Sequence, residues 1–194
     1  ANMSDTVYDR SKIGLMLHYD FNETQGIKVV DKSGNGYDGE LVGNATRTQG
    51  FDDGAIHLAG NKNDYISFPT EAFTGCDDVT ISMWIKLSPD IARMYRTFCP
   101  ALLTVGQTGN YFVLSPNIWD SGRPRCALAT NAIEEDVWPD GIVTANQWAK
   151  WSNLVITKSG DTASIYLDGI LLGTDTIANS FAALAGLGQA RIGS

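Results

Sequence analysis

Short runs in which apolar and polar residues alternate make up much of the 194-residue chain, and Gly, Asn and Asp separate them. A period of two places successive side chains on opposite faces, so each run predicts a β-strand with one buried face. The predicted strands cover residues 15–21, 27–31, 37–43, 55–58, 65–68, 79–87, 101–106, 111–115, 125–130, 153–158, 163–169, 170–174 and 190–193.

The connections between these runs favour antiparallel pairing. Asp168-Gly169 joins two apolar runs directly, and a dipeptide of this kind is the strongest short-range signal for a hairpin. Residues 158–164 form a second candidate hairpin, and only 90–96 and 180–186 could form a helical turn or two. Many short strands with polar connections predict an all-β fold, an antiparallel sandwich of two sheets.

The segment Asp-Lys-Ser-Gly-Asn-Gly, residues 31–36, concentrates residues that accept left-handed backbone conformations. It lacks the third acidic ligand and the closing Glu of an EF-hand loop. We therefore expect a turn at which the chain passes between sheets, with Asp31 or Asn35 accepting hydrogen bonds from backbone amides.

Length and charge narrow the classes of function. A chain of 194 residues suits one domain with a sizeable core. The net charge of −8, with Lys and Arg scattered, argues against nucleic acid and anionic membrane surfaces as partners. No apolar run approaches the ~18 residues of a membrane span, so no membrane insertion is expected.

The three cysteines fit neither a disulfide framework nor a zinc site, because Cys76, Cys99 and Cys126 are widely spaced and both histidines stand alone. We expect buried or free thiols. A bridge between Cys99 and Cys126 is the alternative.

Four stretches in this order resemble a bacterial laminin-G-like domain of the concanavalin A-like lectin/glucanase superfamily. They are residues 17–43, 54–68, 79–87 and 150–174. The resemblance implies a jelly roll of two curved antiparallel sheets over residues 15–194, with 1–14 as an N-terminal extension. The family pattern continues into one more strand after the end of this chain, so the domain is expected to lack its final strand and to leave an open edge at 15–21.

The same resemblance implies an exported bacterial protein, secreted or at the cell surface. Modules of this family are usually attached to polysaccharide-degrading enzymes such as glycoside hydrolases. They bind glycans through loops or the concave face, and they often hold one structural calcium ion. The expected partners are thus a glycan and a neighbouring catalytic domain.

Catalytic residues are hard to find in the chain. Glu134 and Asp136 would share a face on a strand, as a glycosidase pair must, but their segment is interpreted as a solvated acidic loop. His18 and His57 are assigned to sheet faces. We therefore expect no enzyme activity in this domain.

A sugar site pairs an exposed aromatic ring with polar side chains. Trp119, Trp138 and Trp148 stand in polar connections, whereas Trp84 and Trp151 are interpreted as structural residues of the sheets. The predicted carbohydrate-binding residues are Trp119, Asp120, Arg123, Arg125 and Trp138, with Asp136 and Asp140 beside the last. The alternative is that these tryptophans fold back onto the core.

Calcium prefers carboxylate and amide oxygens. Two groups of such residues lie near the family's expected site, and the predicted metal ligands are Asp20, Asn22, Asn61, Asn63 and Asp64.

Three functions follow from these observations. The favoured one is a non-catalytic carbohydrate-binding or adhesion module. The alternative is a structural module that braces a neighbouring catalytic domain without binding sugar. The second alternative is a small jelly-roll glucanase or polysaccharide lyase.

Overall fold

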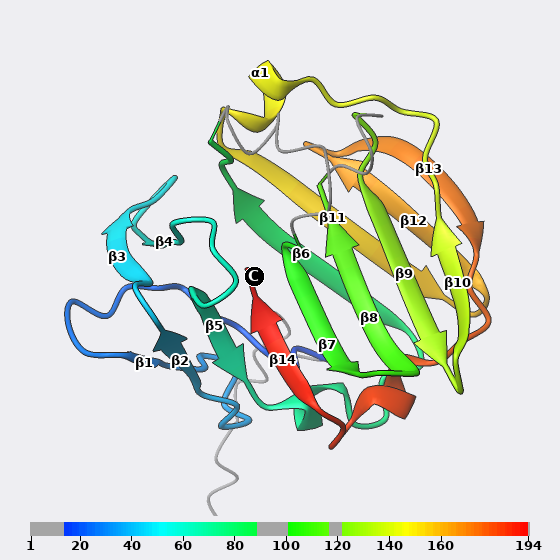
Figure 1. Cartoon of the computed structure of the whole chain (residues 1–194), viewed down its shortest axis with the longest axis horizontal. Coiled ribbons are helices and arrows are strands. Elements are labelled where there is room, and N and C mark those ends of the chain that lie inside the picture. The colour runs from blue at the N-terminus through cyan, green and yellow to red at the C-terminus, as the bar shows by residue number, and fades with distance from the viewer. Residues whose placement is uncertain (1–13, 89–100, 117–121, 194) are drawn as a thin grey trace, which may run out of the picture.

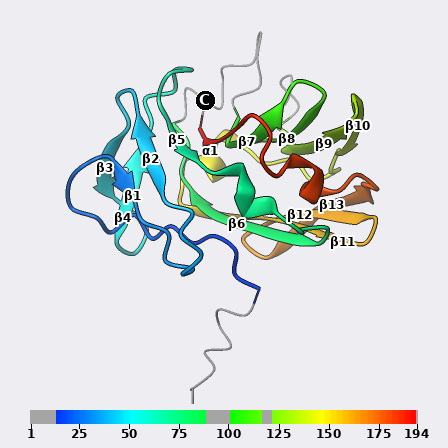
Figure 2. The ribbon, with the colours of Figure 1, turned by 90° about the horizontal axis from the view of Figure 1, so that it is seen from below.

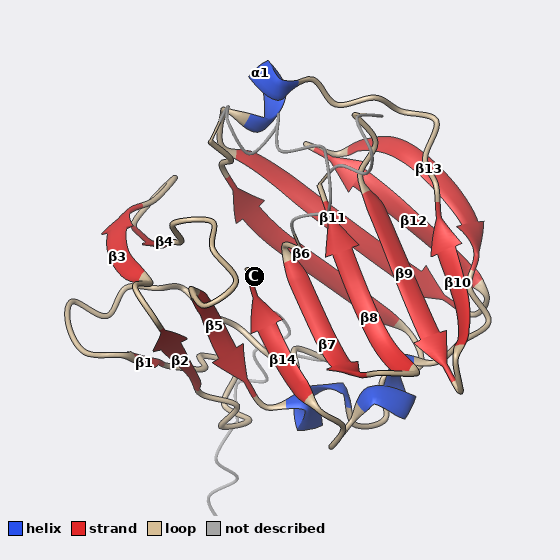
Figure 3. Cartoon of the chain, viewed as in Figure 1, coloured by secondary structure: helices blue, strands red, loops and turns tan. Residues whose placement is uncertain are grey.

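The computed structural model describes residues 14–88, 101–116 and 122–193, and almost all of these residues lie in strands or short connections (Figures 1 and 3). The strands are β1 (Lys28–Val29), β2 (Gly39–Val42), β3 (Thr46–Gln49), β4 (Gly54–His57), β5 (Tyr65–Phe68), β6 (Val79–Ile85), β7 (Leu103–Gln107), β8 (Asn110–Ser115), β9 (Arg125–Thr130), β10 (Ile133–Val137), β11 (Ser152–Ser159), β12 (Thr162–Leu167), β13 (Ile170–Thr176) and β14 (Gln189–Ile192). The predicted helical turn at 90–96 lies outside the described residues.

The strands form two facing layers, as predicted (Figure 2). The larger sheet has the order β1-β2-β5-β14-β7-β8-β9-β10, and the smaller has the order β13-β12-β11-β6. A separate hairpin consists of β3 and β4. All strand pairs among the described residues are antiparallel, which confirms the predicted sandwich of two antiparallel sheets.

The core lies between the two layers because alternate residues of each strand are apolar. Leu114 and Leu128 of the larger sheet face Leu154, Ile156 and Ile165 of the smaller sheet, and all five are almost completely buried. The opposite side chains of the larger sheet are mostly polar, as expected for a sheet face that points away from the core.

In the described part of the chain, three helical turns close the ends of the sandwich: η2 (Thr70–Phe73), α1 (Ala145–Trp148) and η4 (Phe181–Leu184). The turn at η4 lies within the predicted segment 180–186. α1 was not predicted, although Thr144 and Gln147 form a capping box at its start. For Trp148 the alternative, that the ring folds back onto the core, is confirmed, since α1 places it in the core with 2% of its surface exposed.

The segment 31–37 forms the predicted turn, and its Asp31 side chain is the centre of a hydrogen-bond network. Asp31 accepts bonds from the backbone amides of His18 (3.0 Å), Ser33 (2.9 Å) and Tyr37 (3.0 Å). It also accepts a bond of 2.7 Å from the Ser33 hydroxyl. The expected role of Asp31 as an acceptor for backbone amides is confirmed.

The strand predicted at 15–21 is absent. Instead, the turn beside it holds this segment in place. The Asn35 side chain donates to the carbonyls of Leu15 and Met16, and the Ser33 hydroxyl also donates to Met16. The backbone amide of Lys32 donates to the carbonyl of His18. Side-chain and loop partners thus replace a strand neighbour. β6 is an edge strand of the smaller sheet, and among the described residues it pairs with β11 alone.

Two of the cysteines are described, and both are free thiols. Cys126 is completely buried on β9, and this burial raises the pKa of its thiol to about 12. Cys99 lies outside the described residues.

Candidate functional site

The outer face of the larger sheet carries a cluster of polar and aromatic side chains where β8, β9 and β10 lie side by side. Paired residues share a face in antiparallel sheets, so the strand register identifies the members. One row joins Tyr111, Ala129 and Glu134, and the next joins Val113, Ala127 and Asp136. These rows are the floor of the site.

The central strand contributes only alanines to these rows. Because a methyl group does not separate the flanking side chains, groups on β8 and β10 can meet above β9. The Tyr111 hydroxyl donates a hydrogen bond to the Glu134 carboxylate. This bond and, secondly, partial burial raise the pKa of Tyr111, so its hydroxyl stays protonated at neutral pH.

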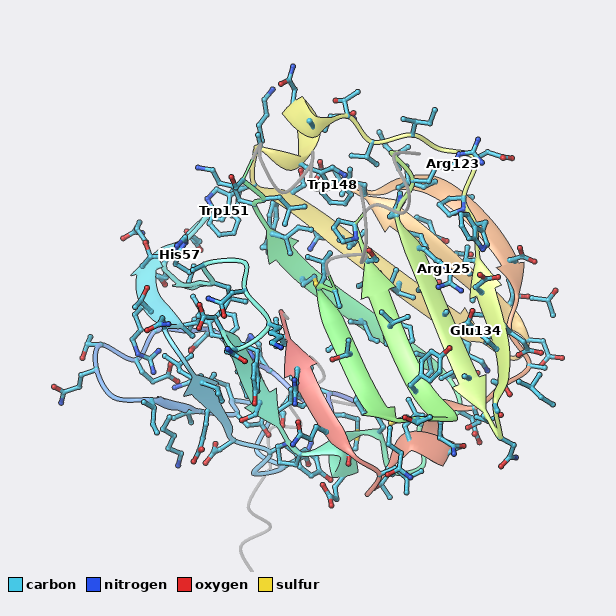
Figure 4. The ribbon with its side chains drawn as sticks, in the orientation of Figure 1. His57, Arg123, Arg125, Glu134, Trp148 and Trp151 are labelled. Carbon is cyan, nitrogen blue, oxygen red and sulfur yellow. The ribbon has the colours of Figure 1, made fainter. Side chains whose placement is uncertain are left out.

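Arg125, at the start of β9, forms ion pairs with both carboxylates. Figure 4 shows Arg125 beside Glu134. The Arg125 Nε donates to Asp136 at 2.8 Å, and a terminal nitrogen contacts Glu134. Burial alone would lower the pKa of Arg125, but the hydrogen bond to Asp136 and the attraction of Glu134 outweigh it, so the pKa is raised. The guanidinium is therefore permanently charged and held in one orientation.

Trp138 follows β10 directly and presents a large ring at the rim of the cluster. Its indole nitrogen donates to Asp136, and the Arg125 guanidinium lies over the ring at 5.5 Å from the centroid. About half of its surface, 47%, remains exposed. The ring is thus fixed on one side and open to solvent on the other.

The arrangement combines a fixed aromatic ring with oriented donors and acceptors. Sugar rings present apolar C–H faces and hydroxyl groups, so an aromatic ring beside Arg, Tyr and carboxylate groups offers both kinds of contact. We define these five residues, Tyr111, Arg125, Glu134, Asp136 and Trp138, as the β8–β10 cluster.

The structure brings together only part of the predicted site. Arg125 and Trp138 are in the β8–β10 cluster, and Trp119 and Asp120 lie outside the described residues. Arg123 lies before β9, where it forms an ion pair of 3.8 Å with the exposed Asp140.

Sequence reasoning missed Tyr111 and assigned Glu134 to a loop. The loop assignment of 134–136 is wrong, because these residues form β10 and pair with β9. The alternation of Glu134 and Asp136 was the available signal for the site. Both carboxylates form ion pairs with Arg125.

The predicted calcium ligands occupy two settings. The backbone amide of Asn22 donates a hydrogen bond to the Asp20 carboxylate (3.1 Å). The Asn22 side chain donates to Asp53 and accepts from the backbone amide of Gly54. Asp20 also lies 3.9 Å from the Lys32 amine. In this setting the oxygens of Asp20 and Asn22 already have protein donors.

The second setting is the turn before β5, which contacts Asn44 in the turn after β2. Asp64, 1% exposed, accepts bonds from the backbone amide of Asn44 (2.8 Å) and from the Asn61 side chain, while the Asn63 amide binds Asn61. The groups that contact Asp64 are therefore hydrogen-bond donors, whereas a calcium ion needs further oxygen ligands. In the part of the chain that the structure describes, His, Cys, Asp and Glu form no group of three that could hold a metal ion. These residues do not fit a calcium site as they stand, and we derive no function through one.

A family model described as the concanavalin A-like lectin/glucanases superfamily matches residues 59–194. No curated protein matches the chain. Among the described residues, no helix is long and apolar enough to cross a membrane.

Several solved structures share the fold at low sequence identity. Domain 4 of an extracellular GH43 arabinanase from Geobacillus stearothermophilus, in complex with arabinotriose, has a TM-score of 0.67 and 18% identity, covering 91% of this chain and 81% of that one. The binding domain of botulinum neurotoxin serotype D has a TM-score of 0.67 and 18% identity, covering 92% of this chain and 42% of that one. An S-layer domain-containing protein from Clostridium thermocellum has a TM-score of 0.52 and 20% identity, covering 87% and 73%.

Proposed function

The chain belongs to the concanavalin A-like lectin/glucanases superfamily, and from this premise we propose that it is a non-catalytic carbohydrate-binding module. The observation that carries the proposal is the β8–β10 cluster. It holds a half-exposed tryptophan ring beside an arginine and two carboxylates whose positions are fixed by mutual contacts. A preorganised site loses less conformational entropy when it binds, which favours recognition of a small polar ligand.

Two further facts support this proposal. The solved neighbours are mostly binding or accessory domains, among them an arabinanase domain in complex with arabinotriose. The larger sheet also leaves its cluster on an outer face, where a glycan chain can reach it. Export and attachment to a polysaccharide-degrading hydrolase belong to the same proposal, since this arabinanase is extracellular.

A second candidate function, a brace for a neighbouring domain, is favoured by the opposite sheet. Trp84 on β6 is 49% exposed and stacks on Phe51, with ring centroids 4.0 Å apart. Leu171 on β13 is 53% exposed. Exposed apolar side chains on this face would be available for contact with a neighbouring domain.

Tryptophan substitutions separate the two functions. We expect Trp138→Ala to weaken glycan binding at least tenfold in isothermal titration calorimetry, because the stacking ring is lost. Trp84→Ala is the matched control: it removes a ring of similar exposure from the opposite sheet and should leave glycan affinity unchanged.

The titration uses arabino-oligosaccharides first and then a panel of plant and host oligosaccharides at millimolar concentration. Absence of binding to every member, or equal losses in both variants, would contradict the proposed site. A loss of glycan affinity in Trp84→Ala alone would indicate that the glycan site lies on the smaller sheet.

A further inference from the structure

A second arginine–aromatic pair lies on the same face as the β8–β10 cluster. Arg191 on β14 lies over the ring of Tyr65 on β5, at 4.3 Å from the centroid. The neighbours of both residues along their strands, Ile66 and Ala190, are buried in the core. Successive side chains alternate between faces, so Tyr65 and Arg191 point to the outer face.

The strand register connects this pair to the cluster. One cross-strand row runs through Arg191, Thr104, Val113, Ala127 and Asp136 without a break. From β14 to β9 the row crosses three strand spacings, about 14 Å. That span is longer than one sugar ring, so a single ligand that touches both arginines must be an oligosaccharide lying across the strands.

The two arginines differ in their charge environment. Arg125 forms ion pairs with both Glu134 and Asp136, so its surroundings carry a net negative charge. Arg191 instead binds the neutral amide of Gln189 through Nε (2.9 Å) and one terminal nitrogen. Within the described residues, no carboxylate lies within ion-pair distance of Arg191.

The geometry of Arg191 suits an external carboxylate. The ring of Tyr65 and the Gln189 amide hold the guanidinium in one plane, and a planar guanidinium binds a carboxylate through two parallel hydrogen bonds. Its neighbours in the row, Ser67 and Thr104, are neutral hydroxyl residues. They add no repulsion against an anionic group.

We propose that Arg191 and Tyr65 form a second subsite, which binds the carboxylate of an acidic sugar in an oligosaccharide whose neutral portion lies on the β8–β10 cluster. This inference rests on the proposed function, because the neutral portion must bind there. The ligand class is therefore a glycan that contains uronic acid or a similar sugar acid. Because Arg191 has no carboxylate partner among the described residues and Arg125 has two, the acidic sugar of the oligosaccharide lies at β14 and its neutral portion lies over β8–β10.

Acidic oligosaccharides and their methyl esters provide the test, because esterification removes the charge and keeps the sugar backbone. The probes are oligogalacturonate, oligoglucuronate and sialyllactose, each paired with its methyl ester and titrated at 0.15 M salt. For at least one pair we expect the acid to bind at least tenfold more tightly than its ester. Arg191→Gln should abolish this difference and leave the affinity for the ester unchanged, whereas Arg191→Lys should retain part of it.

Two controls make the result specific. Lys86→Gln removes one positive charge beside the smaller sheet and should leave the preference for acid intact. Trp138→Ala should weaken acid and ester by the same factor. Unchanged melting temperatures establish that each variant is folded.

Equal binding of acid and ester, or an equal loss for both in Arg191→Gln, would overturn the subsite while leaving the proposed function standing. If neutral and acidic glycans all fail to bind, the proposed function and the subsite fail together.

Discussion

At the scale of single residues, Asp31, two residues after β1, connects the turn at 31–37 to the segment before β1 through its bond with His18. It is 8% exposed and accepts four hydrogen bonds from His18, Ser33 and Tyr37. Burial acts to raise the pKa of this carboxyl, but the hydrogen bonds outweigh burial and lower the pKa below its ordinary value of 3.8. The ionised form is therefore stabilised by folding.

We expect Asp31→Asn to lower the free energy of unfolding by roughly 2 kcal/mol at pH 7, because an amide cannot accept all of these bonds. A carboxyl with a lowered pKa in the folded state stabilises the fold above its unfolded pKa and loses this effect as the pH falls through the folded value. The difference between wild type and variant should thus shrink from pH 5 towards about pH 2.

Urea denaturation at a series of pH values measures this difference, and Asp52→Asn, at an exposed position, is the control. A difference that stays constant with pH would show that the charge of Asp31 does not stabilise the turn.

The network around Asp31 also shows what the sequence could predict at this scale. The Gly, Asn and Asp of segment 31–36 predicted a turn anchored by side chains, because such residues act locally. The sequence left open whether Trp148 is buried, because a polar local sequence does not show that α1 lies against the core.

At the scale of elements, the sequence predicted the hairpin turns more accurately than the strands at the edges of the sheets. The Asp168-Gly169 hairpin between β12 and β13 is confirmed, with φ values of 50° and 79° that a type I′ turn requires. β10 was missed because an edge strand with Glu134, Glu135 and Asp136 has polar residues on both faces. Residues 15–21 alternate like a strand but take their partners from a neighbouring turn.

The contact between β13 and the segment after β10 leads to a prediction for the site. A Cβ added at Gly173 would lie 2.5 Å from the Cα of Pro139, the residue next to Trp138. We expect Gly173→Ala to displace this segment, to lower the free energy of unfolding by about 1–3 kcal/mol, and to weaken glycan binding several-fold.

Gly169→Ala is the matched control for that experiment. Its Cβ would meet no atom within 4 Å, so the positive φ alone costs about 1–2 kcal/mol. Thermal denaturation and calorimetry should show both variants destabilised and only Gly173→Ala impaired in binding. Normal binding by Gly173→Ala would indicate that the position of Trp138 does not depend on β13.

At the scale of the whole molecule, the two sheets present different outer surfaces. The larger sheet carries two arginine–aromatic pairs with polar neighbours, and the smaller carries exposed apolar residues such as Trp84. The alternation of residues predicted the sandwich and its core. It could not predict which polar residues of separate strands meet, because that depends on the register of β8, β9 and β10.

The most direct test of the account follows the indole N–H signals of the five tryptophans by NMR while a glycan is added. With any oligosaccharide that binds in calorimetry, the account predicts that the Trp138 signal shifts progressively to saturation, and that the signals of Trp84 and the buried Trp148 remain in place. A shift of Trp84 with Trp138 unchanged would contradict a glycan site on the larger sheet.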